Sequence, residues 1–193
     1  RYDQLPEEDL NQAKLMFLNY PSNPTGATAP FSFLEKTVDV ADRYDICVVH
    51  DFAYGAIGFD GQKPVSFLQV PGAKDIGIEI YTLSKTYNMA GWRVGFAIGN
   101  PSVIKNLELI QDHYHVSLFG AIQKAAAVAL EGQQQCVTEL VQIYESRRNA
   151  FIDGLKSIGW NADAPKGSFF AWLPVPDGFT SETFADLLLE KAH

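Results

Sequence analysis

The chain has 193 residues, of which 47% are hydrophobic and 12% aromatic, as expected of a soluble globular protein with a substantial core. Its net charge of -8 argues against a nucleic-acid partner, because no basic face is available to neutralise phosphates. No apolar run approaches about 18 residues, so we expect no membrane span. Cys47 and Cys136 are too few and too far apart for a disulfide framework or a zinc site, and we therefore expect a cytoplasmic protein.

The first half of the chain alternates strand-like and helical patterns. Residues 15–19 form a short apolar run that stops at a turn-rich segment, residues 20–26. Residues 31–44 carry apolar side chains at spacings of three and four, which predicts a helix. Residues 46–49 form a β-branched run of the buried-strand type. These patterns predict a strand, a helix and a second strand.

Two further strands are predicted at residues 78–83 and 94–98. Strands separated by helices indicate an α/β fold with a mostly parallel sheet and helices on both faces. Ligands of such sheets bind outside the carboxyl ends of the strands. Asn23, Asp51 and Lys85 each follow a predicted strand, so we expect these three polar groups to meet in one crevice.

The second half is mainly helical. Residues 102–115 and 117–157 have helical patterns, with a turn near Glu131-Gly132, and residues 167–173 read as a strand. Residues 181–193 read as an amphipathic helix that stops without a cap. Since the chain also begins with Arg1 and not with Met, we expect a fragment of a longer protein. A domain boundary is expected near residue 150, inside the long helical region.

Three motifs together resemble the fold-type I aminotransferases, which depend on pyridoxal 5′-phosphate (PLP). They are Asn23-Pro-Thr-Gly26, His50-Asp-Phe-Ala-Tyr54 and Thr82-Leu-Ser-Lys-Thr-Tyr-Asn-Met-Ala-Gly-Trp-Arg93. The resemblance runs over the whole chain, and the third motif is its most specific part. Within the family, the chain is similar to the bacterial branch of alanine, LL-diaminopimelate and methionine-salvage transaminases. The resemblance implies that residues 1–150 belong to the large PLP-binding domain and residues 151–193 begin the small domain.

The resemblance implies that Lys85 forms the Schiff base with PLP. A lysine at a partly desolvated, cationic site is the usual amine for this role, whereas a lone lysine is usually a solvated surface charge. Asp51 would pair with the pyridinium nitrogen. Read without the family, Asp51 is a helix N-cap or a loop charge.

The remaining cofactor contacts follow from the same resemblance. Tyr54 and Asn23 would reach the phenolic oxygen of the cofactor, although alone they read as an ordinary aromatic and a turn residue. Arg93 would bind the phosphate, together with hydroxyl donors from Thr82 and Ser84. Read without the family, Arg93 would form a cation–π pair on the surface. The resemblance also suggests a cis peptide bond at Asn23-Pro24.

No catalytic or binding role is assigned to the two histidines of the helical region. His113 and His115 lack a cysteine or carboxylate partner at metal spacing, so no metal site is expected. The family places further cofactor contacts upstream of Arg1 and the arginine for the substrate carboxylate downstream of His193.

The resemblance implies transfer of an amino group between an amino acid and a 2-oxo acid with ping-pong kinetics, in methionine salvage or in alanine and glutamate metabolism, by a homodimer. Two alternatives stay open. A PLP-dependent lyase on the same fold would use Lys85, Asp51 and Tyr54, and a transcription regulator would use the module to sense PLP. The sequence does not identify the amino donor or acceptor.

Overall fold

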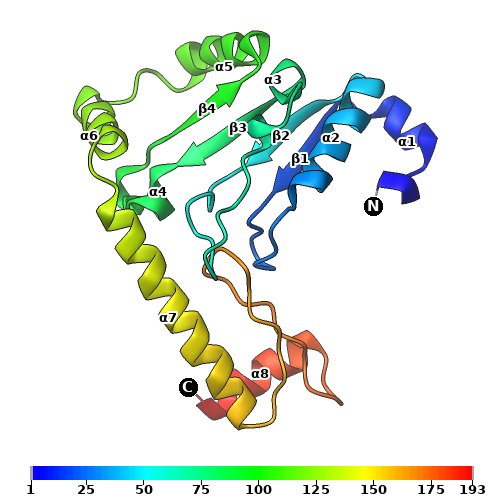
Figure 1. Ribbon diagram of the computed structural model, residues 1–193, viewed down its shortest axis with the longest axis vertical. Helices are drawn as coiled ribbons and strands as arrows, with labels where there is room; N and C mark the ends of the chain where they lie inside the picture. Colours follow the sequence, from blue (N-terminus) through cyan, green and yellow to red (C-terminus); the bar gives the residue numbers. More distant parts are fainter. Residues whose placement is uncertain (1, 193) are drawn as a thin grey trace.

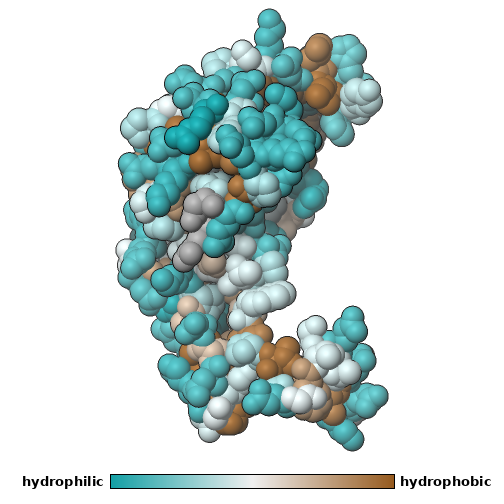
Figure 2. Space-filling model, turned by 90° about the vertical axis from the view of Figure 1, so that its right-hand side faces the viewer, coloured by the Kyte–Doolittle hydropathy of each residue, from teal (hydrophilic) through white to brown (hydrophobic). Residues whose placement is uncertain are grey.

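The computed structural model describes residues 2–192, which form a sheet-containing part and a smaller part (Figure 1). One long helix, α7 (Gln135–Ser157), runs from the sheet to the smaller part, which holds α8 (Ser181–Ala192) and the segments that lead to it. The domain boundary expected near residue 150 lies inside α7. Figure 2 shows the narrow lower part set off from the upper part, with hydrophobic surface on it. Its exposed apolar side chains include Trp172, Phe179 and Leu189.

A four-stranded sheet in the order β1-β2-β3-β4 forms the centre of the larger part. Its strands are β1 (Leu15–Asn19), β2 (Cys47–Asp51), β3 (Gly77–Thr82) and β4 (Gly95–Gly99). The first three strands are parallel, and β4 runs antiparallel to β3. The four strands expected in this half of the chain and the mostly parallel α/β sheet are confirmed. The direction of β4 is a feature that the sequence pattern did not predict.

The expected helical regions are also confirmed. They are α2 (Phe31–Arg43), α5 (Pro101–Tyr114) and α6 (Gly120–Glu131), together with α7 and α8. The structure adds short helices that were not expected, which are α1 (Glu7–Gln12), α3 (Ala73–Ile76) and α4 (Leu83–Thr86), and the 3-10 turns η1 (Tyr2–Gln4), η2 (Phe67–Gln69) and η3 (Ala90–Trp92). The turn expected near Glu131-Gly132 separates α6 from α7. The helix α5 shows why these boundaries are readable in the sequence. Asn100 Oδ1 accepts hydrogen bonds from the amides of Ser102 and Val103, and Pro101 occupies the first helical position.

One face of the sheet, called here the covered face, packs against α2, η2 and α3. The apolar face of α2, with Leu34, Val38 and Ala41, meets Val48 of β2 and Phe67 of η2 in one buried cluster. Because side chains alternate along a strand, His50 and Glu79 also point to this face, whereas Asp51 points to the other. The covered face is therefore the main core of the larger part.

The opposite face, called here the open face, is less well covered. Leu15 is 56%, Phe17 71% and Ile80 38% exposed. All three share this face, because the register pairs Phe17 with Val49 and Asp51 with Ile80. Helices on both faces were expected, and in residues 2–192 the cover of this second face is incomplete.

The strand expected at residues 167–173 is not formed in the described residues. The segment makes only an isolated bridge, Gly58 with Gly167, and then continues without regular structure. A β-strand is stable only when its backbone groups pair with a neighbouring strand, and no further strand lies beside this segment within residues 2–192. The apolar pattern is present, but the pairing that would turn it into a strand is missing.

A buried arginine joins the two parts. Arg148 of α7 donates to both carboxylate oxygens of Asp60, at 2.7 and 2.8 Å, and to the carbonyl of Pro165 at 3.1 Å. The loop after β1 reaches the same joint at Gly26, whose φ is +67°. A Cβ there would lie 2.6 Å from the Cβ of Pro165. Gly26 therefore allows the close approach of the segment that leads to Phe169.

Candidate functional site

Two polar side chains, Asn19 and Asp51, lie at the carboxyl ends of β1 and β2, close to the loop that carries Asn23. The Asn19 amide donates to the carbonyl of Asp51 at 3.1 Å, and Asn19 Oδ1 accepts from the amide of Asn23 at 2.7 Å. One Asp51 carboxylate oxygen accepts from the Ala53 amide, and the side chain is otherwise exposed. The loop that carries Asn23 is thus tied to the strand end that carries Asp51. The Asn23-Pro24 peptide bond is cis, as expected, and so is Tyr20-Pro21.

Lys85 follows the carboxyl end of β3, on the one-turn helix α4. Thr82 caps this helix, because its hydroxyl oxygen accepts a hydrogen bond from the Ser84 amide at 3.1 Å and donates to the Ser84 hydroxyl at 3.0 Å. This cap holds the backbone in a sharp turn directly after the strand. The half-buried Lys85 side chain and the two hydroxyls therefore stand at one end of the sheet.

Phe169, from the joint between the two parts, connects Lys85 with Tyr54. The Lys85 Nζ atom lies 5.4 Å from the centroid of the Phe169 ring, and the Tyr54 ring packs edge-on against the same ring at 5.3 Å. Tyr54 is buried, and burial first, then the negative charge of Asp51, raises the pKa of its hydroxyl. Tyr54 is therefore a neutral hydrogen-bond donor within electrostatic reach of Asp51 and beside the ring that meets Lys85.

Arg93 reaches the same edge because β4 runs antiparallel. It lies just before β4 begins, and the start of β4 pairs with Thr82 at the end of β3. Its backbone is in the left-handed region, with φ at 54°, a conformation that costs free energy for a residue with a side chain and that is often kept at functional sites. Its exposed guanidinium donates to the carbonyl of Ala90 at 3.0 Å. The sheet direction thus brings Arg93 toward Thr82.

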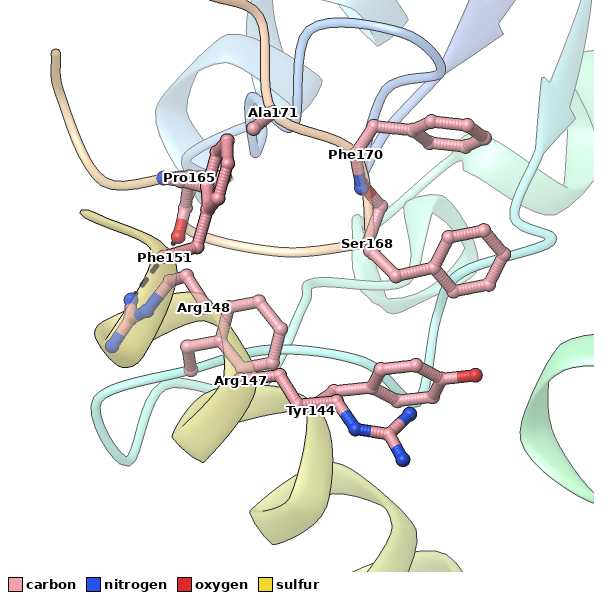
Figure 3. Close-up of a pocket in the computed structure, with 10 residues that line it drawn as sticks. Tyr144, Arg147, Arg148, Phe151, Pro165, Ser168, Phe170 and Ala171 are labelled. Atoms are coloured by element: carbon pink, nitrogen blue, oxygen red, sulfur yellow. Dashed lines mark hydrogen bonds between the residues drawn. The ribbon is translucent and has the colours of Figure 1, made fainter. Parts of the chain in front are cut away.

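A cavity of about 520 Å³ adjoins this edge, between α7 and residues 165–171 (Figure 3). Figure 3 shows Tyr144, Arg147 and Phe151 of α7 on one side and the segment with Pro165 and Phe170 on the other. The Tyr144 ring packs against Phe169 at 5.4 Å, so the cavity shares a wall with the surroundings of Lys85. Its lining is largely aromatic.

The described residues hold no group of three or more histidine, cysteine or acidic side chains able to bind a metal ion. His113 bonds through Nδ1 to the carbonyl of Leu109, one turn earlier on the same helix. Among residues 2–192, no helix is long and apolar enough to cross a membrane.

We compared the chain with models of known protein families. The model of the aminotransferases of class I and II matches residues 1–193. The chain belongs to this family. Aminotransferases of class I and II use PLP, so the cofactor implied by the sequence motifs is the cofactor of the family. The match extends over the whole chain, including the segment around Phe169.

Similar proteins carry two kinds of aminotransferase name. The chain is 67% identical, over 192 residues, to L-glutamine--4-(methylsulfanyl)-2-oxobutanoate aminotransferase of Bacillus subtilis. It is 46% identical to LL-diaminopimelate aminotransferase of Syntrophobacter fumaroxidans, with 98% of the chain matched. Among solved structures, substrate-bound BacF of Bacillus subtilis matches all of the chain at 46% identity and a TM-score of 0.96. The chain spans about half the length of these relatives, between 48% and 49%.

The residues of this aminotransferase chain suit an anionic, phosphate-bearing aldehyde. In the described residues, neither Lys85 nor Arg93 lies within ion-pair distance of a carboxylate. The Lys85 amine beside an aromatic ring can form a Schiff base with an aldehyde, and the Arg93 guanidinium and the hydroxyls at the same edge can bind a phosphate. The side chains present fit the cofactor.

Sequence reasoning did not single out Phe169, which lies at this edge, or His50 and Glu79, which are buried on the covered face of the sheet. Phe169 lies within a stretch that resembles the family, but its contact with Lys85 depends on the tertiary structure. His50 lies inside a motif quoted for Asp51, and Glu79 is an acidic residue between the buried-strand residues Ile78 and Ile80. The position of Glu79 could have been recognised from the sequence, because a carboxylate in a buried strand needs hydrogen-bond or charged partners.

Proposed function

We propose that the protein containing this chain is a PLP-dependent aminotransferase that moves an amino group between an amino acid and a 2-oxo acid. The observation that carries the proposal is the placement of Lys85. Its amine stands directly after a central strand, beside the ring of Phe169, at the sheet end that also holds Asp51, Tyr54 and Arg93.

The side chains would divide the work by their chemistry. When bound, PLP supplies a protonated ring that withdraws electrons from the carbon next to the amino group. Lys85 would hold the cofactor covalently and, once its amine is released by the incoming amino acid, would move the proton from the α-carbon of the amino acid to the former aldehyde carbon of the cofactor. The Asp51 carboxylate would keep the proton on the ring nitrogen.

The other groups would orient the cofactor. The neutral Tyr54 hydroxyl and the Asn23 amide would donate to its phenolic oxygen. Arg93, with the hydroxyls of Thr82 and Ser84, would bind the phosphate, where charge-assisted hydrogen bonds are stronger than neutral ones. Arg93 and the two hydroxyls lie at the same end of the sheet, because Arg93 precedes the start of β4, which pairs with Thr82.

For the substrate, we propose glutamine as amino donor and 4-(methylsulfanyl)-2-oxobutanoate as acceptor, the pair in the name of the 67% identical relative. The aromatic rings near Lys85 support an apolar, sulfur-containing side chain. Tyr54, Phe169 and Tyr144 form a continuous aromatic cluster, and thioether sulfur makes favourable contacts with aromatic rings.

We propose that residues 1–150 belong to the large domain and that residues 151–193 begin the small one. We also propose a cytoplasmic location, which agrees with the two free cysteines.

For the assembly, we propose a homodimer. Large apolar side chains are exposed on and between α5 and α6, among them Leu109, Tyr114, Val116 and Phe119. Such a surface favours association.

The proposed function is tested with the full-length, PLP-loaded protein. Each of several amino acids, including glutamine, glutamate, methionine and LL-diaminopimelate, is added without an acceptor. Formation of one equivalent of the matching 2-oxo acid and of pyridoxamine phosphate supports an aminotransferase, and the fastest donor identifies the substrate. Loss of a side-chain group with unchanged PLP would instead indicate a lyase and would contradict the proposal.

A further inference from the structure

A buried ion pair lies under the proposed site, on the covered face of the sheet. His50 of β2 and Glu79 of β3 are both 0% exposed, and His50 Nδ1 lies 2.8 Å from Glu79 Oε2. The same carboxylate accepts hydrogen bonds from the hydroxyls of Ser66 and Tyr81 and from the Phe67 amide. Burial alone would raise the pKa of Glu79, but the hydrogen bonds from His50, Tyr81 and Ser66 outweigh it and lower the pKa. Glu79 is therefore an ionised acceptor.

The second ring nitrogen of His50 also faces an acceptor. Nε2 lies 3.1 Å from the carbonyl oxygen of Tyr20, the residue that follows β1. A carbonyl oxygen and a carboxylate only accept hydrogen bonds, so each of these two contacts is a hydrogen bond when the ring nitrogen that makes it carries a proton. The ring is held between Phe52, at a centroid distance of 5.1 Å, and Phe67, at 6.3 Å. His50 thus connects β2 with Glu79 of β3 and with Tyr20, the residue that follows β1.

This connection bears on the proposed site through its neighbours. Tyr20 opens the loop that carries Asn23, and His50 precedes Asp51, whose side chain points to the open face. The Asn19 side chain already joins this loop to β2, because it bonds to the backbone amide of Asn23 and to the backbone carbonyl of Asp51. The bond from His50 to Tyr20 is the second tie between the loop and β2.

We propose that His50, oriented by Glu79, is a positioning residue. It sets the position of the Tyr20–Gly26 loop, and with it the side-chain amide of Asn23, relative to Asp51. The inference rests on the proposed function. A buried ion pair by itself adds little stability, since well-packed apolar residues of the same volume often do as well or better. The two bonds of His50 instead fix the position of β2 relative to β3 and to the loop that follows β1.

Two substitutions separate the two bonds. In His50→Asn, the amide nitrogen takes the place of Nδ1, so the bond to Glu79 is retained and the bond to Tyr20 is lost. In His50→Gln, the amide nitrogen takes the place of Nε2, so the bond to Tyr20 is retained. Val48→Ala is the matched control, because Val48 is equally buried on the same face of β2 but its apolar side chain makes no hydrogen bond to Glu79 or Tyr20.

The readouts, on the full-length protein, are thermal unfolding without cofactor, the pH titration of the visible absorbance of the lysine-bound cofactor, kcat and KM. All three variants should unfold at lower temperature. Only His50→Asn should shift the titration upward, by about half to one pH unit, and lower kcat about tenfold with little change in KM, the size of one lost hydrogen bond. In the double variant with Asn23→Ala, the His50→Asn shift should disappear, since both changes remove the same contact.

Equal titrations for His50→Asn and His50→Gln, or a shift that adds fully to that of Asn23→Ala, would overturn the inference. A measurement on the unsubstituted, cofactor-free protein covers the case in which neither variant folds. Nitrogen-15 NMR of His50 should show protons on both ring nitrogens, and an Nε2 without a proton contradicts the bond to Tyr20. If the proposed function itself fails, the unsubstituted protein develops no visible cofactor absorbance, which is a different result.

Discussion

The Lys85 Nζ atom lies 5.4 Å from the centroid of the Phe169 ring, and the two residues come from distant segments of the chain. Lys85 lies on α4, directly after β3, whereas Phe169 belongs to the segment that contacts Arg148 and Gly26 through Pro165. The aromatic ring also contacts Tyr54. The smaller part of the structure therefore supplies a wall to the site that the sheet builds.

Lys85→Ala should abolish both the visible absorbance of the lysine-bound cofactor and transamination in the full-length protein, because the variant lacks the amine proposed to form the Schiff base. Absorbance spectra after PLP addition, with borohydride reduction and peptide mapping, check the result. Lys36→Ala, at an exposed lysine on α2, should behave as the unsubstituted protein. Normal turnover of Lys85→Ala, with a reducible adduct on another lysine, would show that Lys85 is not the residue.

Asp51→Asn should leave PLP bound and lower kcat by roughly 10²- to 10³-fold, as expected when a preorganised charge is removed from an active site. Asparagine keeps the oxygen that accepts from the Ala53 amide, so the local turn should persist. Cofactor content by absorbance and steady-state kinetics measure the two effects, with Asp39→Asn on α2 as the control. Turnover near that of the control would remove Asp51 from the pyridinium role.

Tyr54→Phe should move the pH titration of the cofactor absorbance upward by about one unit. The raised pKa of Tyr54, caused by burial and by Asp51, keeps the phenol protonated at neutral pH, where it donates to the ionised phenolic oxygen. Loss of that donor disfavours the ionised form, by about one hydrogen bond. Packing against Phe169 and Phe170 is retained, so the unfolding temperature should barely change. An unshifted titration would be inconsistent with the proposed contact.

Arg93→Ala should weaken PLP binding by about 10- to 100-fold, the size of one lost charge-assisted hydrogen bond. At saturating PLP, kcat should fall much less, since Arg93 is assigned to the phosphate and not to the reacting carbon. Fluorescence titration of the cofactor-free protein gives Kd, and Arg43→Ala, at an exposed arginine of α2, is the control. A Kd equal to that of Arg43→Ala would place the phosphate elsewhere.

Asp60→Asn should lower the unfolding temperature at neutral pH, with a difference that shrinks in acid. The hydrogen bonds from Arg148 lower the pKa of Asp60 in the folded state. A carboxyl with a lowered folded pKa stabilises the fold above its unfolded pKa, about pH 4, and loses that contribution as pH falls through the folded pKa. Thermal unfolding from pH 7 down to pH 3 measures the effect. Asp153→Asn, exposed on the same helix as Arg148, should show no such pH dependence, and a constant Asp60→Asn difference would contradict the ion pair.

Local patterns in the sequence determined most of the secondary structure. The helices α2 and α5 followed from helical patterns and the strand β2 from a β-branched run, because these signals depend only on residues a few positions apart. The same holds for the motifs around Asn23, Asp51 and Lys85, whose placement after strand ends was readable once the strands were recognised.

Tertiary structure alone decided which of these segments meet. The antiparallel direction of β4 brings Arg93 to the edge that holds Lys85, and no periodicity in residues 95–99 reports that direction. The apolar segment 167–173 reads as a strand but forms none in the described residues, because a strand needs a partner with which to pair its backbone groups. The bond from His50 to Glu79 and the contact of Phe169 with Lys85 likewise depend on how distant segments pack, and local sequence carries no record of that packing.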